Sequence, residues 1–269
     1  MRTLNGQELV GYMEERQARQ VRALRQASHV APKLAIIRTS DDPVIDSYLR
    51  VKKRYGEEIL VDVDVHQIDQ ADALDTIKKL NKDDTVHGIV VQLPLGDPSQ
   101  TEALLDAVEP NKDVDGLGKN AMYTPATAMA IDWLLAGYNV DLRDKTIAIV
   151  GNGRLVGAPL AKLWRANGLE PEVYDDTTNE LGEALKRASV IVTATGVAGL
   201  ITSQMIQPGA VVVDAGTASE EGKIVGDVAA DVREREDLTI TPEKGGVGPL
   251  TVTALFDNVI RAAQATATN

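Results

Sequence analysis

Short apolar runs alternate with segments of helical spacing along almost the whole chain, and this alternation restricts the fold more than any other feature. Strands that helices cover on both faces read as continuous apolar runs, so the pattern predicts an α/β fold with parallel strands. The predicted strands are 34–38, 59–66, 88–93, 146–150, 172–174, 190–194 and 210–214. The predicted helices are 44–58, 71–80, 127–136, 159–167 and 251–263.

The elements fall into two series, which predict two α/β domains with a cleft between them. The first domain takes residues 1–121 and is completed by a C-terminal helical segment, 251–269. The second takes residues 122–250, where strands and helices follow the order of a Rossmann-type dinucleotide-binding domain.

Charge and cysteine content exclude several kinds of partner and chemistry. The formal net charge of −12 disfavours nonspecific binding to nucleic acid or to an anionic membrane. The chain has no cysteine, so it has no disulfide, thiolate nucleophile or cysteine metal site. No stretch approaches the roughly 20 apolar residues that a membrane-spanning helix needs. We therefore expect a cytoplasmic protein with no nucleic-acid partner and no membrane partner.

A glycine-rich segment lies between the predicted strand 146–150 and the helix that follows it. Glycine permits a tight turn and a close approach of backbone N–H groups to a pyrophosphate, and the helix N-terminus adds partial positive charge. The strand–turn–helix context favours a cofactor loop over a turn without a ligand. The candidate cofactor residues of this loop are Gly151, Asn152, Gly153, Arg154, Leu155, Val156 and Gly157.

Two acids, Asp175 and Asp176, follow the next predicted strand. They lie roughly 20 residues beyond the loop, where an acid accepts a hydrogen bond from the 2′-hydroxyl of a bound ribose. The alternative is a solvated pair that caps the next helix.

Three further polar features lie in the first domain. Tyr48 and Lys52 are four residues apart on a predicted helix, so their side chains share one face. Gln92 ends an apolar strand, where open parallel sheets present side chains to a ligand. Residues 112–116 form a polar turn that contains two acids. Taken singly, these features also fit surface packing, a strand end and a solvated loop or helix cap.

Together these motifs resemble the bifunctional methylenetetrahydrofolate dehydrogenase/cyclohydrolase family over nearly the whole chain. Several ordered motifs at compatible spacing are more specific than any one of them. The matching motifs are Tyr48–Lys52, Val91–Pro94, Lys112–Gly116, Gly226–Val228 and Gly245–Thr251.

The resemblance implies a bifunctional enzyme and a homodimer. Its first domain would bind folate and carry the catalytic residues, and its second would bind NAD or NADP. The implied reaction oxidises 5,10-methylenetetrahydrofolate to the 5,10-methenyl form by hydride transfer to the cofactor. Hydrolysis would then give 10-formyltetrahydrofolate. The resemblance implies no metal, because the methenyl carbon is already electrophilic.

The resemblance also implies roles for single residues. Tyr48 would stack on the pterin ring, Asp115 would orient it, and Lys52 would pair with Gln92 at the one-carbon bridge; these four are the implied catalytic residues. The implied substrate-binding residues are Tyr48, Val91, Gln92, Leu93, Asp115, Gly245, Gly246 and Pro249. Besides the glycine-rich loop and the two acids, the implied cofactor residues are Thr195, Gly196, Gly216 and Thr217.

The chain departs from the family near the expected cofactor, and the departures favour NAD over NADP. Asn152 and Gly153 replace an arginine and a serine that would hold a 2′-phosphate, and the two acids add negative charge nearby. Arg154 and Lys186 argue the other way, because either could neutralise a phosphate. We therefore expect NAD to be used at least as well as NADP.

Other functions remain open at this point. One is a dehydrogenase that has lost hydrolysis, although the retained Lys52 argues against it. Another is a cofactor-binding regulatory protein without catalysis, which the departures at 122–125, 215–218 and 243–246 suggest. A third is an amino-acid or shikimate-type dehydrogenase, which does not explain Gln92 or the turn 113–116.

Overall fold

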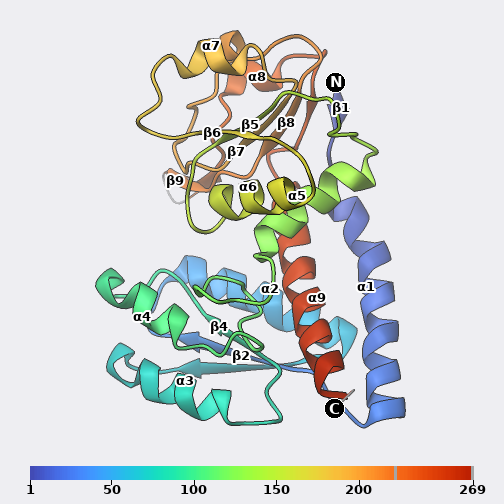
Figure 1. Ribbon diagram of the computed structural model, residues 1–269, viewed down its shortest axis with the longest axis vertical. Coiled ribbons are helices and arrows are strands. Elements are labelled where there is room, and N and C mark those ends of the chain that lie inside the picture. Colours follow the sequence, from blue (N-terminus) through green and yellow to red (C-terminus); the bar gives the residue numbers. More distant parts are fainter. Residues whose placement is uncertain (221–222, 268–269) are drawn as a thin grey trace. The chain divides into compact units, whose positions relative to one another are not determined.

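The computed structural model describes residues 1–220 and 223–267 and divides into two compact units (Figure 1). Unit 1 comprises Met1–Val10 and Thr127–Thr251, and unit 2 comprises Gly11–Ala126 and Val252–Asn269. The first ten residues were assigned by sequence to the other domain; they belong to unit 1 because β1 adds a strand to its sheet. Residues 268 and 269 of the predicted C-terminal segment lie outside the described residues.

Unit 1 contains a six-stranded sheet whose neighbouring strands all pair in parallel. In order across the sheet, the strands are β1 (Arg2–Thr3), β11 (Thr239–Ile240), β8 (Val211–Asp214), β7 (Val190–Thr193), β5 (Ile147–Val150) and β6 (Glu172–Tyr174). The order reverses between β5 and β7, and such a reversal is where parallel sheets bind ligands at their carboxyl ends. The predicted α/β fold with parallel strands is therefore confirmed.

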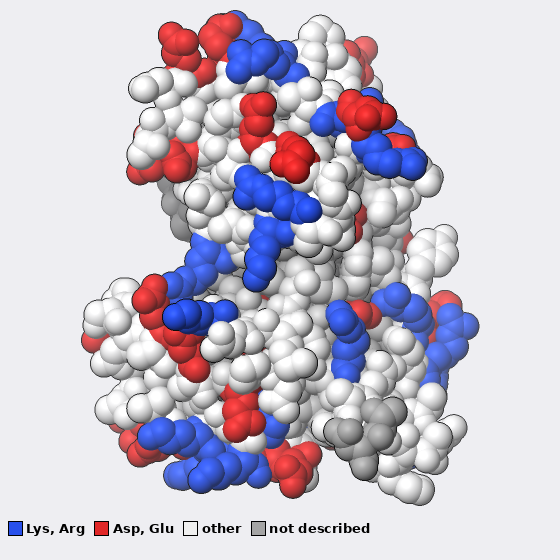
Figure 2. Space-filling view, viewed as in Figure 1, with Lys and Arg blue, Asp and Glu red and all other residues white. Residues whose placement is uncertain are grey.

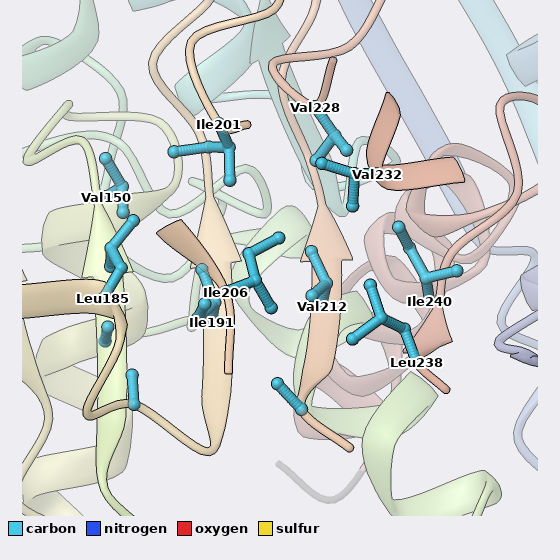
Figure 3. Close-up of a cluster of buried hydrophobic side chains, with 13 residues drawn as sticks. Val150, Leu185, Ile191, Ile201, Ile206, Val212, Val228, Val232, Leu238 and Ile240 are labelled. Carbon is cyan, nitrogen blue, oxygen red and sulfur yellow. The ribbon is translucent and has the colours of Figure 1, made fainter. Parts of the chain in front are cut away.

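Helices cover the sheet of unit 1, and its apolar core lies between these layers (Figure 1). The helices are α5 (Ala126–Gly137), α6 (Gly157–Ala166), α7 (Leu181–Leu185), α8 (Ala230–Arg233) and the short η4 (Ser203–Met205). Figure 3 shows one core cluster, in which Val150, Ile191 and Val212 extend from adjacent strands toward Leu185 and Val232. Alternate strand residues point to opposite faces, which is why these strands are apolar throughout. Two further short strands, β9 (Ala218–Glu220) and β10 (Lys223–Val225), pair antiparallel.

Unit 2 contains a parallel three-stranded sheet of order β3-β2-β4. Its strands are β2 (Lys33–Arg38), β3 (Asp62–Gln67) and β4 (Gly88–Val91), and its helices are α2 (Pro43–Ile59), α3 (Ala73–Asn81) and α4 (Thr101–Asp106). Short helical turns are η1 (Leu24–Ser28), η2 (Gln70–Asp72) and η3 (Pro98–Gln100). One face of the sheet packs against α3 and α4 through a buried apolar cluster. The predicted strand 59–66 begins later, because α2 continues to Ile59 and Leu60 turns the chain with a φ of 65°.

Helices α1 (Gly6–Ala23) and α9 (Val247–Ala267) lie side by side where both belong to unit 2 (Figure 1). Arg16 forms an ion pair with Asp257 at 2.6 Å, and Gln17 Nε2 donates to the Thr253 carbonyl at 2.9 Å. The predicted helix 251–263 is too short at both ends. The helix begins at Val247, and Pro249 fits its first turn, where a missing N–H breaks no helical hydrogen bond.

The described surface gives two facts that bear on partners. No helix among residues 1–220 and 223–267 is long and apolar enough to cross a bilayer. Figure 2 shows that both acidic and basic side chains occur on the face in view.

Candidate active site

Lys52 and Gln92 form a direct contact in unit 2. Lys52 lies on α2 and Gln92 directly follows β4, and Lys52 Nζ donates to Gln92 Oε1 at 2.9 Å. Gln92 Nε2 donates to the Leu93 carbonyl at 2.9 Å, which fixes the amide so that its oxygen faces the lysine. The lysine is thus held at the carboxyl end of a parallel strand, as the sequence predicted.

Asp115 lies close enough to Lys52 for each charge to affect the other. Burial lowers the pKa of Lys52, and the negative charge of Asp115 opposes that shift. Burial raises the pKa of Asp115, and the positive charge of Lys52 opposes that shift. A lowered pKa and a fixed hydrogen-bond partner make this lysine a better candidate for proton transfer than an exposed lysine.

The remaining predicted folate-side residues of unit 2 differ in exposure. Tyr48 lies one helical turn before Lys52 and is 40% exposed, so its ring is accessible for stacking. Val91 is buried in the core cluster beside α3 and α4, so its side chain serves packing and only its backbone remains for a ligand. Leu93 is partly buried against the same cluster.

Lys112 anchors the turn that carries Asp115, a role that sequence reasoning missed. Its side chain is 9% exposed, and its Nζ donates to three carbonyls at the end of α3. The acceptors are Leu80 at 3.1 Å, Asn81 at 2.8 Å and Asp83 at 2.8 Å. A cation that satisfies the last carbonyls of a helix is favoured by the helix dipole.

Two buried polar side chains hold the same turn from other directions. Asp113 accepts from the backbone of Gly116 at 3.0 Å and of Gly118 at 2.7 Å. Asn258, a fully buried residue of α9, donates through Nδ2 to the carbonyls of Val114 and Thr124 at 2.9 and 3.0 Å. Sequence reasoning missed Asn258; the available signal was that it lies, with Asp257, between the apolar runs 254–256 and 259–260 of the last helix.

The glycine-rich loop of unit 1 connects β5 to α6, and two of its glycines are required by their surroundings. Gly151 has a φ of 100°, and a Cβ there would lie 2.5 Å from the Ala194 carbonyl oxygen. A Cβ on Gly157 would lie 1.7 Å from the Gly151 carbonyl oxygen. Gly153 differs, because a Cβ there would meet open space.

The four other residues of the loop also lie at the accessible end of β5. Asn152, Arg154 and Leu155 are exposed, and Val156 is half-buried directly before α6. The close strand-to-helix turn leaves backbone N–H groups of the loop and the start of α6 at the carboxyl edge of the sheet, an arrangement that fits a pyrophosphate.

Asp175 and Asp176 follow β6 and are both exposed. Asp175 Oδ1 accepts from the backbone and the hydroxyl of Thr177, at 3.0 and 2.6 Å, and these bonds lower the pKa of Asp175. One oxygen of Asp175 therefore accepts hydrogen bonds within the chain, as in the alternative in which the two acids form a cap. These bonds stabilise the turn at Thr177 and not the start of α7.

The turns after β7 and β8 meet at the same edge of the sheet. Thr195 and Gly196 follow β7, and Gly216 and Thr217 follow β8, its direct neighbour. A Cβ on Gly196 would lie 3.7 Å from the Thr217 carbonyl oxygen, so the two turns are in close proximity.

Gly245, Gly246 and Pro249 are the predicted folate-side residues that lie in unit 1. Gly245 has a φ of 84°, and its carbonyl accepts from Gln7 N at 3.1 Å. Gly6 and Gly246 are in close backbone contact, because a Cβ on Gly6 would lie 2.0 Å from the Gly246 carbonyl oxygen. These glycines therefore allow the N-terminal segment to pack directly on the turn before α9.

Two family models match the chain in succession. The tetrahydrofolate dehydrogenase/cyclohydrolase catalytic domain matches residues 4–115, and the NAD(P)-binding domain of the same family matches residues 125–267.

Individual relatives match over nearly their whole length. The bifunctional protein FolD of Lactobacillus helveticus is 36% identical, covering 97% of this chain and 96% of the relative. The crystal structure of the bifunctional FolD methylenetetrahydrofolate dehydrogenase/cyclohydrolase from Campylobacter jejuni has a TM-score of 0.92 at 32% identity, covering 99% of each chain. The Trypanosoma brucei dehydrogenase-cyclohydrolase, solved with NADP and an inhibitor, has a TM-score of 0.91 at 26% identity, covering 99% of this chain and 98% of that one.

Proposed function

The chain belongs to the tetrahydrofolate dehydrogenase/cyclohydrolase family, and from this premise we propose that it catalyses both reactions of that name. It oxidises 5,10-methylenetetrahydrofolate to the methenyl form with NAD(P), and it hydrolyses the methenyl form to 10-formyltetrahydrofolate. The observation that carries the proposal is the contact of Lys52 with Gln92 at 2.9 Å beside Asp115, in a chain that also has a dinucleotide loop. A cofactor-binding protein without catalysis would not need this partly buried lysine.

In the first reaction, the protein orients two reactants. Tyr48 supplies an aromatic face for the pterin ring, and Asp115 accepts hydrogen bonds from its amino and ring N–H groups. Gly151, Gly157 and the start of α6 would hold the pyrophosphate of the cofactor. The nicotinamide ring supplies the hydride acceptor for the methylene carbon.

In the second reaction, water adds to the bridging carbon of the methenyl cation and loses one proton. The carbon–N5 bond then breaks, the hydroxyl proton of the adduct passes to N5, and the formyl group stays on N10, so one proton is released overall. Lys52 Nζ is the group that we assign to these proton transfers, because its lowered pKa allows it to accept and return a proton. Gln92 holds the lysine at the reacting carbon.

We further propose that NAD is used at least as well as NADP. Asp175 has a lowered pKa and is therefore a fixed negative charge after β6, which repels a 2′-phosphate and accepts from a 2′-hydroxyl. Lys186, one of the two opposing cations, is engaged with Glu183 at 2.6 Å. Gly153 offers no side chain to a phosphate.

One set of assays tests these proposals. Absorbance of methenyltetrahydrofolate is followed during its hydrolysis without a cofactor, and during its formation from the methylene form with NAD or with NADP. We expect both reactions. Hydrolysis without cofactor reduction, or the reverse, would show that the chain has kept one activity only, and neither reaction would support a regulatory role.

The cofactor preference has its own variants. We expect the Asn152→Arg/Gly153→Ser double variant to gain activity with NADP, because the space at Gly153 is open. A strong NADP preference in the parent that survives Asp175→Ala and Asp176→Ala, but collapses in Arg154→Ala, would contradict the assignment of charge.

We also propose a cytoplasmic homodimer, on the family resemblance alone. Sedimentation equilibrium of the full chain measures the mass directly, and a monomer mass at all concentrations would contradict the dimer.

A further inference from the structure

Asp227, the central residue of the Gly226–Val228 motif, has no role in the reactions described above. It is fully buried in unit 1, and its Oδ2 accepts from Thr193 Oγ1 and from Thr195 N, both at 2.6 Å. The first donor lies at the end of β7 and the second in the turn that follows. One carboxylate oxygen therefore fixes the exit of the chain from β7.

The second oxygen of Asp227 lies against the neighbouring turn. Oδ1 receives no hydrogen bond from residues 1–220 and 223–267. A Cβ on Gly216 would lie 2.0 Å from this oxygen, although the φ of Gly216 is not in the left-handed region. Position 216 is therefore glycine because the carboxylate occupies the space, and not because of its backbone conformation.

A second carboxylate connects Asp227 to the turn after β8. Asp214, whose side chain is 3% exposed, accepts from the backbone N–H groups of Gly216 and Asp227 at 3.1 and 3.0 Å. It also accepts from Arg233 Nη2 at 2.9 Å. Asp214 thus has a cationic partner, whereas the hydrogen bonds of Asp227 come from a hydroxyl and a backbone amide.

We propose that Asp227 is a positioning residue for the nicotinamide cofactor, holding the turns 193–197 and 214–217 in the geometry that receives it. The inference rests on the proposed dehydrogenase activity. Both hydrogen bonds that Asp227 accepts fix the chain at the end of β7 and in the turn after it, and its Oδ1 fills the space that Gly216 leaves in the turn after β8. The two turns that it holds contain Thr195, Gly196, Gly216 and Thr217, and they lie at the carboxyl edge of adjacent strands.

The two proposed activities provide an internal control for the test. Hydrolysis of methenyltetrahydrofolate consumes no cofactor, and Lys52, to which we assign its proton transfers, lies in unit 2, whereas Asp227 lies in unit 1. In Asp227→Ala we expect the KM for the cofactor to rise about tenfold or more, which corresponds to losing a hydrogen bond to an ionised acceptor. The hydrolysis rate should stay within about twofold of the parent, and Asp227→Asn, which keeps one acceptor oxygen, should restore most of the cofactor affinity.

Gly216→Ala tests the same contact from the other side. Its new Cβ displaces the carboxylate, so we expect a similar rise in the cofactor KM. The double variant Gly216→Ala/Asp227→Ala should be no worse than Asp227→Ala alone, because the clash is gone. If Asp227→Ala does not fold, the cofactor KM and the hydrolysis rate of Gly216→Ala and of Asp227→Asn are compared with those of the parent.

Asp231→Ala is the matched control. Asp231 is an exposed acid of unit 1 that accepts from Ser203 N at 3.1 Å, so its loss also removes one hydrogen bond to a backbone amide. A parent-like cofactor KM in both Asp227→Ala and Gly216→Ala, or equal loss of both activities, would overturn the inference. A parent that reduces neither NAD nor NADP would instead refute the proposed function.

Discussion

Replacement of Lys112 by methionine should destabilise unit 2 and weaken folate binding together. Methionine retains most of the apolar stem but removes the ammonium group, which donates to three carbonyls at and just after the end of α3. The Leu80 and Asp83 carbonyls also accept from backbone N–H groups, of Asp83 at 3.2 Å and of Val86 at 3.0 Å, so the main loss is at the Asn81 carbonyl. The turn that begins at Lys112 also carries Asp115. Loss of the ammonium group therefore loosens the side chain that we propose binds the pterin.

The expected loss of stability follows from these contacts. A hydrogen bond to a charged group contributes about 1.5–3 kcal/mol, and a buried acceptor left unsatisfied costs about 1–3 kcal/mol. Two of the three bonds of Lys112 are only partly buried, so water replaces part of what they supply. We therefore expect the free energy of unfolding to fall by about 2 kcal/mol, which lies within both ranges.

The assay must report on unit 2. Both tryptophans, Trp133 and Trp164, lie in unit 1, so their fluorescence does not follow the loss of α3. Urea unfolding is therefore measured by far-UV circular dichroism, with Lys119→Met as the control, because Lys119 is an exposed lysine in the same segment. A Lys112→Met variant within about 1 kcal/mol of the parent would refute the argument that this lysine satisfies the end of α3.

Four other outcomes are expected. Lys52→Met should slow hydrolysis of methenyltetrahydrofolate by about a hundredfold or more without lowering the Tm, and a parent-like rate would remove Lys52 from the mechanism. Because the folded pKa of Lys52 lies below 10.5, the unfolded chain binds more protons between the two values. The unfolding free energy of the parent should thus rise with pH relative to Lys52→Met across that window, and parallel pH profiles would contradict the lowered pKa. Asp115→Ala should raise the folate KM about tenfold or more, as measured by initial rates, and an unchanged KM would exclude its pterin contact. Gly157→Ala should lower the Tm because its Cβ would meet the Gly151 carbonyl at 1.7 Å, whereas Gly153→Ala should not; equal Tm values would contradict the close approach of α6 to β5.

The strands that carry the fold were predictable because they are buried on both faces. Residues 147–150 and 190–192 are apolar without interruption, and the structure places both runs in interior strands of the sheet of unit 1. The strands β1 and β11 were missed, because two residues carry no periodicity and their pairing joins Arg2 to Thr239 across almost the whole chain. The start of α9 was misplaced because its first turn contains Gly248 and Pro249, which locally indicate a loop.

The residues of the candidate site also include some that the sequence predicted and some that it did not. Tyr48, Lys52, Gln92 and Asp115 were identified because each belongs to a compact motif, and motif order along the chain identified the family. Asn258 was not, because its hydrogen bond to Val114 spans 144 residues and exists only after α9 has packed. Local spacing predicts which face of an element a side chain occupies, but it does not predict which distant backbone group that side chain will meet.

The interleaving of the two units also affects how the protein is made. The chain passes from one unit to the other after residues 10, 126 and 251, so unit 2 receives its last segment only after all of unit 1 has been synthesised. That segment holds Phe256, which is fully buried and packs on Tyr55 with ring centroids 5.3 Å apart. During synthesis on the ribosome, residues 11–126 therefore keep part of their apolar surface exposed while the residues of unit 1 emerge. During that interval we expect the incomplete unit 2 to be prone to aggregation, because the apolar surface that Phe256 covers is still exposed.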